Sequence, residues 1–221
     1  MRIVLVHGSW HTGEHWAPVA DSLRAAGHEV HTPTVAGHGV GVDKRVNHAQ
    51  CTQSIVDFII EHDLQDFALL GHSYGGTIIS KVVEQIPDRV RRLVYWNAFV
   101  PADGQSLNDN VPAHYRELFD GIAAASSDDT VMLPFPIWRE AFINDADLET
   151  AERTYKSLSA EPYQPFRDKL DLKKFYALQT PRSYINCTED TALPQGEWGW
   201  HPRMSSRLGL FRLVQLRAAT K

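Results

Sequence analysis

The sequence is poor in several features that mark particular classes of protein. It has only two cysteines, Cys51 and Cys187, in 221 residues, which are too few for a disulfide framework. No apolar run approaches the roughly 20 residues that a membrane-spanning helix needs. The net charge of -5 gives no positive footprint for nucleic acid, and no block of like charges suggests a binding tail. We therefore expect no nucleic-acid partner and no membrane partner, and we interpret both cysteines as small buried side chains.

The first residues indicate where the protein works. The segment from Met1 to Gly8 is too short for a signal peptide and has no small-residue cleavage site. Its apolar run, Ile3 to Val6, is typical of a buried strand. We therefore expect a cytoplasmic protein.

Apolar runs of strand length alternate with helical patterns along most of the chain. This alternation predicts one α/β domain over residues 1–221, with a mostly parallel sheet and helices on both faces. Residues from about 101 to 180 break the rhythm and hold many of the prolines and aromatics. An insertion between two strands is a natural cap over a site. The late strands are predicted at residues 183–187 and 210–216, with a helix between them that starts near Pro194.

A glycine-rich turn follows the apolar strand at residues 67–70. Gly71-His72-Ser73-Tyr74-Gly75-Gly76 fits the pattern G-x-S-x-G, and a helical pattern comes after it. A serine on a sharp turn between strand and helix projects its hydroxyl above the sheet, and small neighbours avoid a clash. A plain glycine-rich turn is the alternative. The strand and helix on either side favour Ser73 as a nucleophile.

The loop after the first strand, His7-Gly8-Ser9-Trp10, is the second candidate element. It can place a backbone N–H beside the nucleophile, so we assign the oxyanion hole to the amides of Ser9 and Tyr74. His7, His11 and His15 recur every four residues, which on a helix would suggest a metal face. Gly8 and Gly13 argue against a helix there, so we expect loop histidines that line a pocket and no metal.

Asp190 follows the strand at residues 183–187 by three positions. An aspartate just past a late parallel strand is where a serine hydrolase of this chain order carries its triad acid. The alternative is an N-cap carboxylate for the helix expected near Pro194. The residues alone leave these two interpretations open.

Together these segments resemble a known family. Val4 to Gly13, the turn from Gly71 to Gly76, and Tyr184 to Asp190 are similar to the methyl-esterase and hydroxynitrile-lyase family of the α/β-hydrolases, which includes plant salicylate methyl esterases. The resemblance covers most of the chain apart from the cap. It implies the α/β-hydrolase fold, Ser73 as nucleophile, Asp190 as acid, a mostly helical cap over an apolar pocket, and no cofactor. Gly8 stands where the lyase branch has a hydroxyl residue, so the esterase branch fits better.

The resemblance also implies a histidine after the last strand, on a Gly-x-His loop before a closing helix. Here Leu216 leads into Arg217 to Lys221, and no histidine follows His201. We interpret His201 as a packed or surface residue, and His72 as pointing into the core. The 221 residues are therefore expected to be less active than a version extended by such a loop and helix. An uncovered last strand is also expected to favour a homo-oligomer.

These residues favour a serine hydrolase that cleaves a small-molecule ester, lactone or carbamate. The cap aromatics Trp138, Phe142, Tyr163 and Phe166 are candidates for the wall of its pocket, although periodicity does not separate them from cap core. A non-catalytic small-molecule binder and a hydroxynitrile lyase are the alternatives. Burst release from an activated ester distinguishes the first alternative, and cyanide release from mandelonitrile distinguishes the second.

Overall fold

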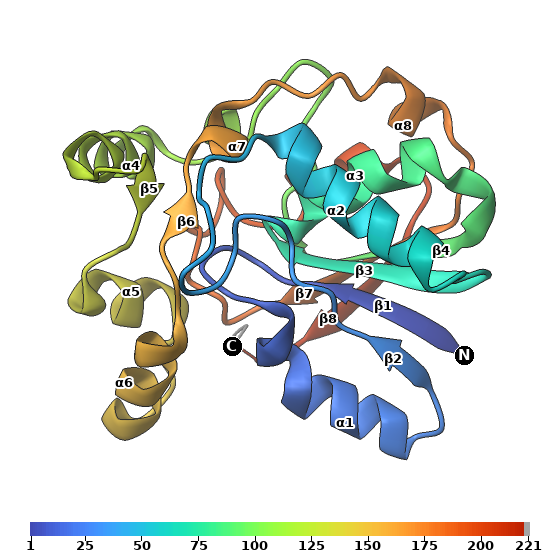
Figure 1. The fold of residues 1–221 in the computed structure, drawn as a ribbon, viewed down its shortest axis with the longest axis horizontal. Helices are drawn as coiled ribbons and strands as arrows, with labels where there is room; N and C mark the ends of the chain where they lie inside the picture. The colour runs from blue at the N-terminus through green and yellow to red at the C-terminus, as the bar shows by residue number, and fades with distance from the viewer. Residues whose placement is uncertain (219–221) are drawn as a thin grey trace.

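A six-stranded sheet forms the centre of the computed structural model, which describes residues 1–218 (Figure 1). The strand order is β2-β1-β3-β4-β7-β8, and every neighbouring pair is parallel. The strands are β1 (Arg2–Val6), β2 (Glu29–His31), β3 (Phe67–Ser73), β4 (Val90–Ala98), β7 (Arg182–Cys187) and β8 (Arg212–Leu216). The predicted fold class, an α/β-hydrolase fold with a parallel sheet, is confirmed.

Helices cover the sheet on both faces. In Figure 1, α1 (Ala17–Ala25) lies below the sheet, whereas α2 (His48–Glu61) and α3 (Gly75–Gln85) lie above it. Alternate residues of β1 divide between the two layers: Val4 and Val6 join the large core, and Ile3 and Leu5 join a smaller core with α1. This is the period of two that a strand buried on both faces requires.

Local signals explain where two of these helices begin and end. Asn47 caps α2 in a reciprocal capping box, since its side chain accepts from the Gln50 amide at 2.9 Å while Gln50 Oε1 accepts from the Asn47 amide at 2.9 Å. Gly27 follows α1 with φ +83, a left-handed conformation that ends a helix without steric cost.

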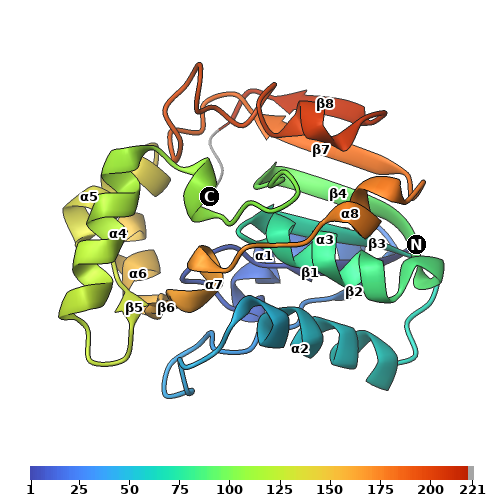
Figure 2. The same ribbon diagram turned by 90° about the horizontal axis from the view of Figure 1, so that it is seen from above.

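The segment between β4 and β7 forms a layer at the carboxyl ends of the strands (Figures 1 and 2). Most of it is short helices, with one antiparallel pair of strands, β5 and β6. Its elements are α4 (Ala113–Ala125), β5 (Thr130–Val131), α5 (Phe135–Phe142), α6 (Leu148–Ser157), β6 (Glu161–Pro162), α7 (Gln164–Arg167) and α8 (Lys173–Ala177). Residues 1–218 also contain four short 3₁₀ helices, η1 (Gly13–Trp16), η2 (Pro87–Arg89), η3 (Asn108–Asn110) and η4 (Ser205–Leu208).

The end of the described chain differs from the expectation in two ways. The last strand begins at Arg212, whereas it was expected to begin at residue 210. Its apolar residues Leu213, Val214 and Leu216 are exposed, as expected for an uncovered last strand. Residues 191–204 form turns and bends, so the helix expected near Pro194 is wrong. Within residues 1–218, no helix is both long and apolar enough to cross a membrane.

Candidate active site

Ser73 is the last residue of β3 and lies at the carboxyl edge of the sheet. It has φ +51, a left-handed conformation that a residue with a side chain rarely adopts. The turn is closely packed around it. A Cβ added at Gly71 would lie 2.5 Å from the Gly75 carbonyl oxygen, and one at Gly75 would lie 2.7 Å from the His7 carbonyl oxygen. The strand, the strained serine and the helix α3 directly after it have the geometry of a nucleophile turn.

The loop after β1 lies directly beside this turn, because β1 and β3 are neighbours in the sheet and Val6 pairs with Gly71. A Cβ added at Gly8 would lie 3.0 Å from Ser73 Cβ and 2.9 Å from His72 Nδ1. Gly8 therefore permits a close approach of backbone to the serine. Neither the Ser9 amide nor the Tyr74 amide donates a hydrogen bond to another of the described residues. Both predicted oxyanion donors are thus unpaired beside Ser73.

Asp190 follows β7, which is separated from β3 by β4 alone, so it comes to the same edge of the sheet as Ser73. Its side chain is buried, and Oδ1 accepts from the Ala192 amide at 2.9 Å and from Trp200 Nε1 at 2.8 Å. Oδ2 has no hydrogen-bond partner within residues 1–218. Residues 191–204 form turns and bends, so no helix begins at Asp190 for its side chain to cap. The carboxylate is therefore held through one oxygen and leaves the other available.

A cavity opens over Ser73, and its wall is almost entirely apolar. The polar lining residues are Ser73, Ser9 and Tyr115. Burial, with a further contribution from the Asp190 carboxylate, raises the pKa of the Tyr115 phenol. The rest of the wall consists of Trp10, Phe99, Leu107, Val111, Phe119, Phe142, Phe166, Ala192, Leu193 and Trp200.

The cap contributes two of its four predicted aromatics to this wall. Phe142 and Phe166 line the cavity, whereas Trp138 and Tyr163 are buried elsewhere in the cap. Tyr163, for example, donates to Asp120 at 2.6 Å and accepts from Asn108 Nδ2 at 2.8 Å. The cavity wall therefore joins the predicted cap to the loops of the sheet edge.

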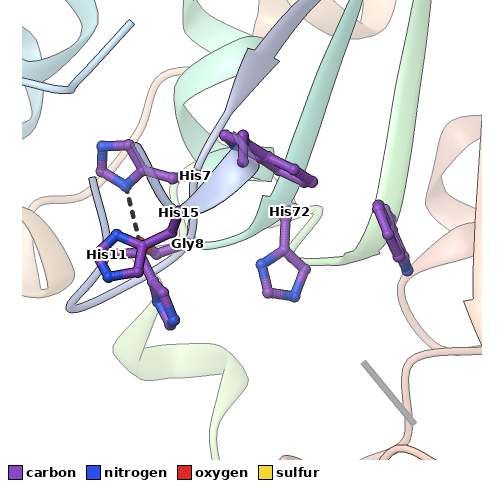
Figure 3. A pocket seen from close by; sticks show the side chains of 7 residues that line it. His7, Gly8, His11, His15 and His72 are labelled. Atoms are coloured by element: carbon purple, nitrogen blue, oxygen red, sulfur yellow. Dashed lines mark hydrogen bonds between the residues drawn. The ribbon is translucent and has the colours of Figure 1, made fainter. Parts of the chain in front are cut away.

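A second cavity is lined by Gly8 and by histidines (Figure 3). Figure 3 shows the rings of His7, His11 and His15 grouped to one side of His72. Burial lowers the pKa of His11 to about 3 and that of His72 to about 4, so these imidazoles are neutral at physiological pH. His7 donates from Nδ1 to the Gly8 carbonyl and accepts from the Val35 amide at Nε2, which fixes a neutral tautomer.

None of these histidines is hydrogen-bonded to Ser73, whose hydroxyl has no partner within residues 1–218. His201 is engaged in its own turn, with Nδ1 at 2.6 Å from Ser205 Oγ. His72 adjoins the turn, but burial favours its neutral form and its ring makes no hydrogen bond to a described residue. The described structure thus brings together the predicted serine, acid and oxyanion amides, and it assigns no general base.

Two polar groups beside the site were not predicted from the sequence. Asn97, at the end of β4, bonds both backbone groups of Cys187, from which the Asp190 turn departs. Glu161 of β6 is fully buried and accepts from the Trp10 amide at 2.7 Å. An acidic residue inside a predicted cap carries no sequence signal for such a role, because its partner lies 151 positions away.

Comparison with known proteins shows the family to which the chain belongs. The model of the Alpha/beta hydrolase family matches residues 3–218. A solved extracellular alpha/beta-hydrolase from a Paenibacillus species, described as sharing structural and functional homology with tobacco Salicylic Acid Binding Protein 2, is 48% identical with a TM-score of 0.97, over 99% of this chain and 90% of that one.

Two curated relatives are named for carbendazim hydrolysis and for salicylic acid binding. A carbendazim hydrolyzing esterase of Nocardioides sp. is 38% identical over 66% of this chain and 64% of its own length. Salicylic acid-binding protein 2 of Nicotiana tabacum is 26% identical over 99% of this chain and 89% of its own length.

Proposed function

The chain belongs to the alpha/beta hydrolase family, and from this premise we propose that it is a carboxylic ester hydrolase that acts through Ser73. The observation that carries the proposal is the left-handed Ser73, φ +51, at the floor of a largely apolar cavity. The esterase names of its relatives support the same reaction class.

In the proposed reaction, the Ser73 oxygen attacks the ester carbonyl carbon and its proton passes to a base. The carbonyl oxygen becomes an oxyanion that accepts hydrogen bonds from the Ser9 and Tyr74 amides; losing one such donor typically costs about 3–4 kcal/mol of transition-state stabilisation. The alcohol then leaves with a proton, and water cleaves the acyl-serine. Asp190 would orient an imidazole base through its available Oδ2, and none of the described histidines is hydrogen-bonded to it.

The cavity wall supports an uncharged substrate. None of its lining residues carries a charge that would pair with an ionised group. Burying an unpaired carboxylate there costs several kcal/mol, whereas an aryl or alkyl group is favoured by its apolar area. Small aromatic or alkyl esters fit best, and carbamates or lactones of that size react by the same attack. The partner is therefore a small-molecule substrate.

A matched pair of esters tests both the reaction and the specificity. Methyl 4-methylbenzoate and the 4-(methoxycarbonyl)benzoate anion differ in charge at the position farthest from the ester. We expect kcat/KM to favour the neutral ester by at least about 100-fold, because each 1.4 kcal/mol corresponds to a factor of ten. Equal rates would contradict an apolar acyl pocket, and the absence of Ser73-dependent hydrolysis of every ester would contradict the enzyme.

One observation favours a second candidate, the non-catalytic binder. The Ser73 hydroxyl has no hydrogen-bonded base within residues 1–218, and an unactivated serine is a poor nucleophile. A binder would take up the neutral ester without releasing methanol, and calorimetry beside product analysis separates the two. A cytoplasmic location stays a prediction from the sequence, and the Paenibacillus relative is described as extracellular.

A further inference from the structure

Trp10, the residue after the proposed oxyanion donor Ser9, is held in an unfavourable conformation. Its φ is +65, which is rare for a bulky side chain. Three hydrogen bonds hold it, and all come from the strands β5 and β6 or the residues beside them. The Trp10 amide donates to Glu161 Oε2 at 2.7 Å, its carbonyl accepts from the Ser159 amide at 3.0 Å, and its indole donates to the Val131 carbonyl at 2.9 Å. The cap thus restrains the peptide that follows Ser9.

Glu161 is the carboxyl-bearing member of this set and has no access to solvent. Its Oε1 lies 3.0 Å from His38 Nε2, while His38 Nδ1 lies 3.1 Å from the Ala36 carbonyl oxygen. A carbonyl oxygen only accepts, so Nδ1 carries a proton, and a further proton lies between Nε2 and Oε1. The buried carboxylate therefore satisfies both oxygens, one on His38 and one on the Trp10 amide.

His38 also contacts Tyr74, whose amide is the second proposed oxyanion donor. Its ring stacks on the ring of Tyr74 at 5.7 Å between centroids and 23° between planes. Glu161 consequently connects to both proposed donors, to Ser9 through the Trp10 amide and to Tyr74 through His38. No other described carboxylate bonds to either loop.

We propose that Glu161 is a positioning residue of the oxyanion hole, through which the cap sets the geometry of the Ser9 amide. This rests on the proposed function. An amide aimed at the oxyanion stabilises the transition state more than the bound ester, so loosening it lowers kcat and leaves KM nearly unchanged. A purely structural role in docking the cap would instead change stability, or KM through the cavity wall.

Two substitutions at Glu161 distinguish these roles. Glu161→Met keeps the volume but removes the acceptor, and kcat for p-nitrophenyl acetate should fall at least about tenfold with KM within about twofold. Glu161→Gln should restore kcat to within about threefold, because its amide oxygen can accept from Trp10 while its NH₂ donates to neutral His38. Tyr163→Phe is the matched control, since it removes two hydrogen bonds, to Asp120 and from Asn108, one residue beyond β6, and neither involves Trp10.

An unchanged kcat in Glu161→Met, or the same loss in Tyr163→Phe, would overturn the proposal. If Glu161→Met does not fold, Glu161→Asp decides: it withdraws the carboxylate by one methylene, so kcat should still fall several-fold, and an unchanged kcat would overturn the proposal.

Amide hydrogen exchange gives a readout that does not need turnover. The peptide covering residues 7–11 should exchange faster in Glu161→Met than in the unsubstituted chain. In Tyr163→Phe it should exchange at the rate of the unsubstituted chain. Faster exchange in a chain that hydrolyses no ester would sustain the positioning role and reject the proposed function. Unchanged exchange would reject the positioning role alone.

Discussion

Asn97 and Cys187 join the ends of two neighbouring strands. Asn97 Oδ1 accepts from the Cys187 amide at 2.7 Å, and Asn97 Nδ2 donates to the Cys187 carbonyl at 3.3 Å. Both residues are buried, and the turn that carries Asp190 begins just after Cys187. One side chain thus satisfies two backbone groups where the β4–β7 ladder has ended, and it fixes the departure point of the Asp190 turn.

Replacing Asn97 by glycine tests this link without adding backbone strain, since Asn97 has φ +34. The buried Cys187 amide loses its partner, and the Cys187 carbonyl keeps only the Asp190 amide at 3.4 Å, so we expect the free energy of unfolding to fall by about 1–3 kcal/mol. Urea denaturation measures it. Asp66→Gly is the control, because Asp66 is also left-handed at φ +52 but exposed. Equal effects at the two positions would contradict the role of the Asn97 amide.

Ser73→Ala should abolish turnover of p-nitrophenyl acetate, because the covalent step needs the serine oxygen. Ser9→Ala is a matched control within the same cavity. It removes a hydroxyl but keeps the backbone N–H to which we assign the oxyanion contact, so its kcat should stay close to that of the unsubstituted chain. Steady-state kinetics of the three proteins checks both expectations. Unchanged turnover in Ser73→Ala would reject the nucleophile assignment.

The strands and the serine turn could be predicted because their signals are local. Phe67 to Leu70 is an apolar run. The glycines beside Ser73 are required because the backbone of the same turn leaves no room for a Cβ, as at Gly71. The helix expected near Pro194 failed because Pro194, Gly196, Gly199 and Pro202 interrupt that segment, where turns form instead.

The polar contacts between distant residues could not be predicted, because their signals are not local in the sequence. Glu161 meets His38 across 123 positions, and Asn97 meets Cys187 across 90. No periodicity or spacing connects such pairs, because they are brought together by the order of strands and the path of the cap. The division of the cap aromatics, with Phe142 in the cavity wall and Trp138 in the cap core, has the same origin.

Two glycine substitutions should have opposite effects on stability. A Cβ at Gly76 would lie 2.4 Å from the Phe99 carbonyl oxygen, so Gly76→Ala forces backbone to move and should cost about 1–3 kcal/mol. A Cβ at Gly121, inside α4, meets nothing within 4 Å, so Gly121→Ala should gain about 0.5–1 kcal/mol from helix propensity. Thermal or urea unfolding compares them. A stabilising Gly76→Ala would show that the serine turn is looser than described.

Free imidazole should accelerate ester hydrolysis by the 221-residue chain. Ser73 lines the apolar cavity, and neither its hydroxyl nor Asp190 Oδ2 has a hydrogen-bond partner within residues 1–218, so an added imidazole can accept the Ser73 proton. We expect a saturable increase of roughly tenfold or more, which is below the roughly 10²–10⁴-fold that a positioned general base contributes. The Ser73→Ala protein in the same buffer gives the background rate of imidazole itself.

The same imidazole measurement on Asp190→Asn tests whether Asp190 takes part. Its Oδ1 can still accept from Ala192 and Trp200, so the turn should persist, but an NH₂ replaces the oxygen that would orient the imidazole. The acceleration should then be lost. Equal acceleration with aspartate and asparagine would remove Asp190 from the mechanism.

Stability should fall as the pH is lowered from about 6.5 to about 4, in part because of His48. Burial lowers its pKa to about 4, and the Asp168 carboxylate only partly opposes this effect. Thr77 Oγ1 donates to the Tyr74 carbonyl at 2.8 Å, so it accepts from His48 Nε2 at 2.9 Å, which fits a neutral ring. Above pH 6.5 the ring is neutral in the folded and the unfolded chain. Between the two pKa values only the unfolded chain binds the proton, so acid favours unfolding by up to about 1.4 kcal/mol per pH unit for one such group.

Urea denaturation at several pH values between 6.5 and 4 measures this effect. The free energy of unfolding should depend less steeply on pH in His48→Gln, by close to one proton, and the exposed His114→Gln is the control. An identical slope in His48→Gln would assign the acid sensitivity to other groups.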